Sequence, residues 1–144
     1  MDIHGDWQLK LVGDVLVTTL GGSWNTEAAV AYFEEYRNLA APLGRYGILV
    51  RYDGWGGYTP EAEAIMRELR HWAHDHGCAC AAWVLEDALM KKWVELFLRH
   101  GDGLYETRAY STAAEAIAWL ATQGFTLDPA EALRWVPELG GSPR

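Results

Sequence analysis

The regular alternation of short apolar runs with amphipathic segments constrains the fold of this chain most. The apolar runs have the length and composition of buried β-strands, and we predict strands over 7–11, 15–20, 46–52, 78–85 and 105–110. Between them, apolar residues recur with a helical period, which predicts helices over 26–40, 60–77, 88–100 and 112–124. Strands that alternate with helices in this way favour a mainly parallel sheet with right-handed crossovers.

Turn and cap residues support these boundaries. A short Gly-Asp loop separates the first two strands, as is typical of an antiparallel hairpin. Asn25 or Thr26 is expected to cap the first helix, and Thr59 followed by Pro60 is a strong helix start. The predicted fold class is therefore α/β, with a mainly parallel sheet of about five strands, an N-terminal antiparallel hairpin and four helices.

The length of 144 residues suits a single domain, and a hydrophobic content of 50% excludes a wholly disordered chain. We predict one α/β domain over residues 1–124. Residues 125–144 form a C-terminal extension that packs on this domain or trails from it, with one further helical turn expected around 129–135.

The charge balance argues against a nucleic-acid partner. Twelve basic and twenty acidic residues leave a net charge of −8, which repels a phosphate backbone, and the longest basic run is only Lys91-Lys92. No apolar stretch approaches the roughly 20 residues of a membrane span, and the N-terminus lacks the pattern of a signal peptide. We therefore expect a cytoplasmic location.

A cluster of histidines and cysteines resembles a metal site in its composition alone. On the predicted helix, however, His71 and His74 point away from the apolar stripe, and Cys78 and Cys80 belong to a buried strand. Two cysteines are also only half of the ligands of a structural zinc site. We predict buried reduced thiols and no specific metal site, with adventitious metal binding of the histidines as the alternative.

The glycine-rich segment 54–57 follows a predicted strand and precedes a helix, as phosphate-binding loops do. It lacks the Lys-Ser/Thr pair of a P-loop and the glycine spacing of a dinucleotide fingerprint. We predict an unusual backbone turn here and no cofactor. The sequence also contains no nucleophile-elbow motif, which favours a non-enzymatic chain.

Aromatic residues mark the candidate site. Trp24 and Trp55 are each expected in a loop just after a strand, and ligands of open α/β sheets bind at the carboxyl ends of strands. This placement predicts an aromatic-lined cleft for a small apolar molecule or a partner segment, unless the rings simply close the end of the core. The candidate binding residues are Trp24, Asn25, Asp53, Trp55, Tyr58, Thr59 and Asp87.

Three groups of residues, within about 7–124, resemble the bacterial SpoIIAA-like family, whose members combine features of STAS and CRAL-TRIO domains. They are the hairpin ending Thr19-Leu20-Gly21-Gly22-Ser23, the segment Gly47–Asp53 with Tyr58–Ala62 behind it, and Arg108-Ala109-Tyr110-Ser111 with the later Glu115-Ala116 and Trp119-Leu120.

The resemblance implies a regulatory or binding domain with no established enzyme activity. Anti-sigma-factor antagonists of this kind are switched by phosphorylation of a Ser or Thr at a helix start, which corresponds to Thr59. Their Asp-Ser-Ser-Gly hallmark is replaced here by Gly57-Tyr58-Thr59-Pro60, and three nearby carboxylates oppose a phosphate, so we expect no such switch.

We therefore predict a non-enzymatic domain that engages a protein partner or a small apolar molecule through these loops. The alternative is a small enzyme that uses Asp53 and Asp87 in the same cleft. A homo-oligomer is compatible with either function.

Overall fold

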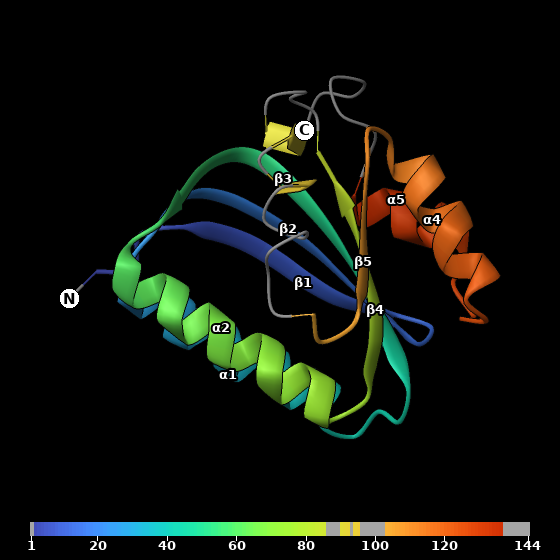
Figure 1. Ribbon diagram of the computed structural model, residues 1–144, viewed down its shortest axis with the longest axis horizontal. Helices are drawn as coiled ribbons and strands as arrows, with labels where there is room; N and C mark the ends of the chain where they lie inside the picture. The colour runs from blue at the N-terminus through green and yellow to red at the C-terminus, as the bar shows by residue number, and fades with distance from the viewer. Residues whose placement is uncertain (1, 86–89, 93, 96–102, 137–144) are drawn as a thin grey trace.

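Five strands form a single mixed sheet in the order β1-β2-β3-β4-β5 (Figure 1). The computed structural model describes residues 2–85, 90–92, 94–95 and 103–136. The β1–β2 pair is antiparallel and every other neighbouring pair is parallel, which confirms the predicted fold class. The strands are Asp6–Val12 (β1), Val15–Trp24 (β2), Tyr46–Tyr58 (β3), Cys78–Val84 (β4) and Glu106–Tyr110 (β5).

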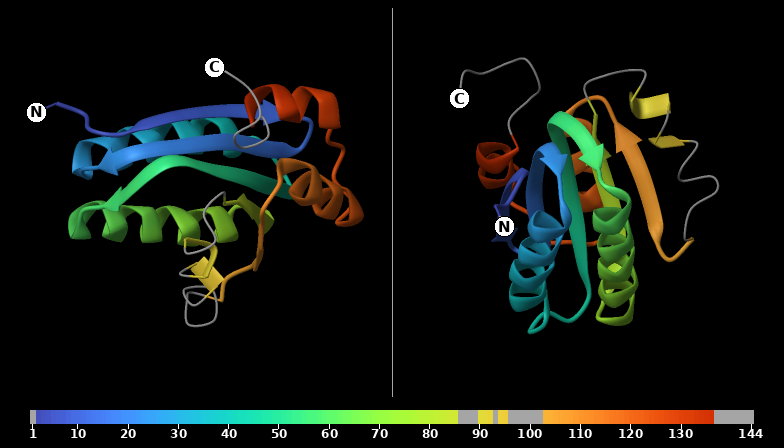
Figure 2. Two further views of the ribbon diagram at one scale, coloured as in Figure 1. Left: turned by 90° about the horizontal axis from the view of Figure 1, so that it is seen from above. Right: turned by 90° about the vertical axis from the view of Figure 1, so that its left-hand side faces the viewer.

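Helices cover both faces of the sheet. Thr26–Ala40 (α1) and Pro60–Asp75 (α2) lie side by side on one face, and Ala113–Thr122 (α4) and Pro129–Trp135 (α5) lie on the other (Figures 1 and 2). The helix predicted over 88–100 falls mostly outside the described residues, of which 90–92 and 94–95 are helical. With α5, the described residues carry five helical segments, one more than predicted, because the turn expected around 129–135 is a helix.

The two faces of the sheet have different cores. The α1–α2 side is rich in aromatic residues, including Trp24, Tyr32 and Tyr36, whereas the α4–α5 side is mainly aliphatic. Residues beyond 124 contribute to the second core through Phe125, Ala132 and Val136, all of them buried. Burying this apolar surface on both faces supplies the main favourable term in folding.

Both predicted helix caps on the α1–α2 side are confirmed. The Asn25 side-chain oxygen accepts from the Ala28 N–H at 3.0 Å, and the Thr59 hydroxyl accepts from the Ala62 N–H at 3.1 Å. Each satisfies a backbone donor that the first helical turn leaves without an internal partner. Because β2 leads into α1 and β3 leads into α2, the two helices begin at the same edge of the sheet (Figure 1).

The prediction that Trp24 and Trp55 lie in loops just after their strands is wrong. Both strands continue as a paired extension, in which Gly22 lies opposite Trp55 and Trp24 lies opposite Tyr58. Register shifts around Gly22 accommodate the irregular glycine-rich segment, and Gly54 and Gly57 have positive φ angles of 62° and 94°. Glycine adopts this backbone conformation without the steric penalty of a side chain. The glycines thus bend a strand, where the sequence suggested a loop.

Candidate functional site

A groove opens at the edge of the sheet where α1 and α2 begin. Its volume is about 520 Å³, and it is lined by His4, Ser23, Trp24, Asn25, Gly56, Gly57, Tyr58 and Thr59. The groove lies over the paired ends of β2 and β3, so the carboxyl ends of two parallel strands and the first residues of two helices meet there. This is the edge at which open α/β sheets bind their ligands.

Asn25 ties the N-terminal segment to one side of the groove. Its side chain accepts from the His4 N–H at 3.2 Å and donates to the Asp2 carbonyl at 2.9 Å, and its own N–H donates to the His4 carbonyl at 3.2 Å. The same side chain caps α1. Asn25 therefore holds the segment before β1 and the start of α1 together, so that His4 is fixed beside the groove.

An aromatic cluster supports the groove from below. Trp24 is only 1% exposed, and its indole N–H donates to the Gly21 carbonyl at 2.9 Å. Its ring contacts those of Tyr58 and Trp55, with centroids 5.8 and 6.0 Å away. Trp24 is thus a fixed core residue, one side of which borders the groove. This placement agrees with the alternative interpretation of the sequence, in which these aromatic rings close the end of the core.

Tyr58 is the aromatic residue best placed to contact a bound molecule. It is partly exposed, lines the groove and packs against Trp55 with centroids 4.6 Å apart. Burial raises the pKa of its hydroxyl well above the usual value, so the hydroxyl is neutral at physiological pH. Trp55 supports Tyr58 from three residues earlier on the same strand, β3, and does not itself line the groove.

Gly56 and Gly57, which have no side chains, form part of the groove lining. A Cβ atom on Gly56 would collide with the Ser23 hydroxyl on the neighbouring strand, whereas one on Gly57 would meet open space. Glycine at 56 therefore allows the two strands to approach closely with the Ser23 hydroxyl in this position. Ser23 is exposed beside it. Neither Ser23 nor His4 was among the candidate binding residues, because a serine after two glycines is explained by a turn and His4 precedes the first predicted strand.

The charges around the groove are mixed. The positive ends of two helices point toward it, but Glu27 in the first turn of α1 and Glu61 and Glu63 in that of α2 are acidic. The Glu63 carboxylate is held by Arg70 at 3.2 Å. Full carboxylate charges outweigh the half charge of a helix end, so the surroundings do not favour a strongly acidic ligand.

Asp53 lies apart from the groove lining. Its carboxylate pairs with the guanidinium of Arg51 at 3.4 Å, and the Arg51 side chain is only 3% exposed. A buried charge needs a charged partner, so the Asp53 carboxylate balances the positive charge of the buried Arg51 guanidinium. Arg51 was overlooked because it falls within an apolar run, although a lone arginine in a core strand is itself a sign of a buried ion pair. Asp87 lies outside the described residues.

The histidines and cysteines are not brought together. His71 and His74 are exposed on α2, while Cys78 and Cys80 are buried with free thiols, as predicted. Burial raises the pKa of Cys78 to about 12 and that of Cys80 to about 11, so both thiols are protonated and unreactive at neutral pH. In the part of the chain that the structure describes, no group of three or more histidine, cysteine or acidic side chains is arranged to hold a metal.

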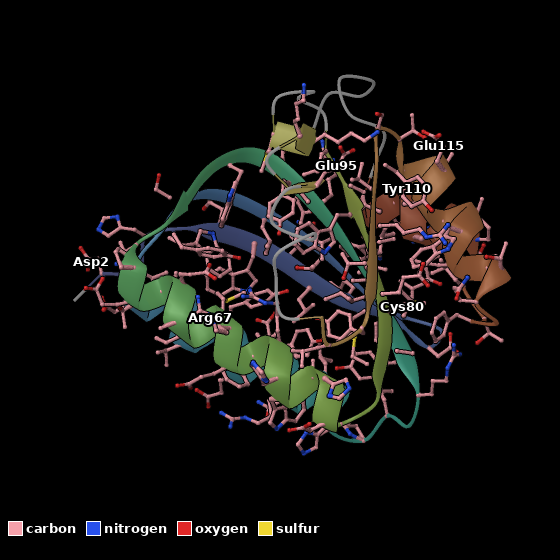
Figure 3. The ribbon with its side chains drawn as sticks, in the orientation of Figure 1. Asp2, Arg67, Cys80, Glu95, Tyr110 and Glu115 are labelled. Carbon is pink, nitrogen blue, oxygen red and sulfur yellow. The ribbon has the colours of Figure 1, made fainter. Side chains whose placement is uncertain are left out.

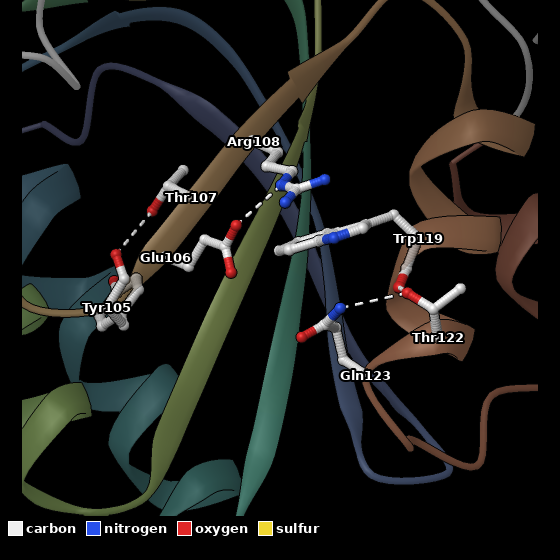
Figure 4. A network of polar contacts seen from close by, with 7 residues as sticks. All are labelled: Tyr105, Glu106, Thr107, Arg108, Trp119, Thr122 and Gln123. Carbon is white, nitrogen blue, oxygen red and sulfur yellow. Dashed lines mark hydrogen bonds and ion pairs between the residues drawn. The ribbon is translucent and has the colours of Figure 1, made fainter.

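A second polar cluster, on β5 and α4, has a structural explanation. The Arg108 guanidinium pairs with Glu106 at 2.8 Å and lies over the Trp119 ring, 5.0 Å from its centroid (Figure 4). The Arg108 and Glu106 side chains are about half exposed, whereas Trp119 is buried. Side chains fill the space between the helices and the sheet (Figure 3). Exposed pairs of this kind contribute roughly 0–1 kcal/mol, and the contact fixes α4 against the edge strand.

Comparison with solved structures assigns the fold. An uncharacterised protein of the DUF3478 family from Shewanella loihica PV-4, described as having a SpoIIAA-like fold, superposes with a TM-score of 0.62 at 16% identity. The match covers 83% of this chain and 97% of that protein. The chain has a SpoIIAA-like fold.

The unphosphorylated form of the anti-sigma factor antagonist SpoIIAA shares this SpoIIAA-like fold. It matches with a TM-score of 0.51 at 18% identity, over 81% of this chain and 98% of that one. No family model matches the sequence, and no curated protein matches it significantly. Within the described ranges, no helix has the length and apolar character needed to cross a membrane.

Proposed function

We propose that this chain is a non-enzymatic regulatory domain that binds a segment of a partner protein in the groove between the starts of α1 and α2. The observation that carries the proposal is the position of the groove, which is lined by Trp24, Asn25, Tyr58 and Thr59 at the carboxyl edge of the sheet. A volume of about 520 Å³ suits a few side chains of a bound segment, since ligand sites span roughly 300–1,000 Å³.

The groove combines features that favour a peptide. The partly exposed Tyr58 offers an apolar contact surface and is held in place by the buried Trp24, and rigid aromatic anchors are typical of binding sites. The acidic first turns of both helices favour a segment with lysine or arginine over an acidic one. The fold supports the proposal by analogy alone, since the SpoIIAA protein that shares it is an anti-sigma factor antagonist.

Filling the groove tests the proposal directly. Ser23 is exposed and borders Gly56, so Ser23→Trp places a large ring in the groove. Ala118, exposed on α4 across the sheet, gives the matched control Ala118→Trp. Both variants are checked for a native thermal transition before the wild type and each variant are used to capture partners from cells that express the protein.

We expect the wild type and Ala118→Trp to retain the same partner and Ser23→Trp to lose it. The captured protein is then titrated with the purified domain to show saturable one-to-one binding. Equal capture by the folded Ser23→Trp variant would contradict the proposed site, and the absence of any saturable partner would contradict the proposed function.

A further inference from the structure

A second hollow lies inside the α1–α2 side of the molecule and is distinct from the groove. It is a cavity of about 80 Å³ between the helices and the sheet. Its inner wall is mainly apolar, and the buried aliphatic residues there are Leu20, Ile48, Val50, Met66, Leu69 and Ala81. The buried Tyr32 and Tyr36 also line it, and their hydroxyls are already hydrogen-bonded to the hydroxyls of Thr18 and Tyr46. Among the described residues, Tyr58 alone lines both the cavity and the groove.

The rim of this cavity is polar. The lining residues that reach solvent include Arg70 and the tyrosines Tyr52, Tyr58 and Tyr105. The side chain of Arg70 is 17% exposed, and its positive charge acts on all three tyrosine hydroxyls. Burial raises the pKa of each hydroxyl more strongly than Arg70 lowers it, so the three groups remain protonated donors. The Glu63 carboxylate, which pairs with Arg70, opposes the effect of Arg70 on the pKa of Tyr52 and Tyr58. The cavity therefore has an apolar end and a hydrogen-bonding end, at which Arg70 is the cationic donor.

We propose that this cavity binds a short-chain carboxylic acid, with its hydrocarbon tail against the inner wall and its carboxylate at the rim beside Arg70 and the tyrosines. A carboxylate accepts hydrogen bonds from both a guanidinium and neutral hydroxyls, and those from the charged donor are the strong ones. Arg70 already contacts Glu63 at 3.2 Å, and the ligand carboxylate would share the guanidinium with it.

The size of the cavity limits the tail. At about 30 Å³ for each water-sized group, 80 Å³ accommodates just under three such groups, or about three carbons of the tail, while the carbon next to the carboxylate lies at the rim. A long-chain lipid exceeds this space several-fold. The structure therefore assigns a short acid, and pentanoate is the probe of choice.

The test is a titration of the isotope-labelled full chain followed by nuclear magnetic resonance. Pentanoate should produce saturable shifts centred on the Met66 methyl group, while 1-butanol and butylamine, which lack the carboxylate, should bind at least tenfold more weakly. Acetate should also bind more weakly, and dodecanoate no more tightly than pentanoate. Absence of saturable pentanoate binding, equal binding of butanol or butylamine, or tighter binding of dodecanoate would overturn the proposal.

Variants locate the carboxylate. Arg70→Met keeps an apolar stem and removes the guanidinium, and we expect it to weaken pentanoate binding at least tenfold. Arg67→Met is the matched control, because Arg67 is on the same helix and also approaches Glu63, at 3.9 Å, but is 57% exposed and does not line the cavity. Unchanged affinity in Arg70→Met, or an equal loss in Arg67→Met, would contradict the assignment. Pentanoate binding in the cavity does not depend on a partner in the groove. These results therefore test this proposal separately from the proposed function.

Discussion

Replacement of Trp24 by alanine should destabilise the protein severely, because this ring is the buried centre of the aromatic cluster under the groove. The side chain is 1% exposed and donates a hydrogen bond to the Gly21 carbonyl. Removal of a buried tryptophan typically costs about 3–5 kcal/mol, and leaving the Gly21 carbonyl without its donor adds to that. Trp55 is only partly buried, and we expect Trp55→Ala to cost about 1–3 kcal/mol.

Urea unfolding measures this difference. With a slope of about 2 kcal/mol/M, the midpoint of Trp24→Ala should fall by about 2 M and that of Trp55→Ala by clearly less. Trp24→Phe, which keeps a ring but loses the indole N–H, should lie between the wild type and Trp24→Ala. A cost below 1 kcal/mol for Trp24→Ala, or one no larger than that of Trp55→Ala, would refute the assignment of Trp24 as the central packing residue.

Three further predictions concern the same face of the sheet. Thr59→Ala should cost about 1 kcal/mol in thermal unfolding through the lost helix cap, while Thr59→Asp, which preserves a capping oxygen, should cost less. Gly56→Ala should cost about 1 kcal/mol, because its methyl group would turn the Ser23 hydroxyl aside and crowd the Ser23 Cβ, and Ser23→Gly should partly rescue it; Gly44→Ala, in open space, is the control. The raised pKa of Cys78, about 12, means that its thiol stays protonated when folded and ionises when unfolded, so the free energy of unfolding should fall above about pH 9, and less steeply in Cys78→Ala. Equal melting of both Thr59 variants, a tolerated Gly56→Ala, or an unchanged pH slope in Cys78→Ala would contradict the respective arguments.

The sequence predicted the architecture well where periodicity and capping agree. The caps at Asn25 and Thr59 depend on local chemistry, and the parallel pairing of strands follows from the alternation of strands and helices. The extension of β2 and β3 through the glycine segment was not predictable in this way. Glycine marks both loops and bulged strands, and the choice between them depends on pairing with a neighbouring strand that local sequence does not reveal.

The candidate site was predictable in part for the same reason. Residues at the end of a strand or the start of a helix reach one edge of the sheet, so Asn25, Tyr58 and Thr59 could be grouped from the sequence. The burial of Trp24 could not be inferred from the sequence, because this ring becomes part of the core only when the N-terminal segment and Tyr58 pack around it. The engagement of Asp53 by Arg51 likewise depends on the buried position of the arginine in the folded sheet.

Site-specific photo-crosslinking tests the central claim, that the groove is the partner-binding surface, most directly. A benzophenone amino acid is placed at position 23, beside the groove, or at position 118, on the opposite side of the sheet, and the protein is irradiated in cells that express it. We predict a discrete adduct with a second protein from position 23, which excess unmodified domain competes away, and no such adduct from position 118. Adducts from position 118 alone, or none from position 23, would contradict the account.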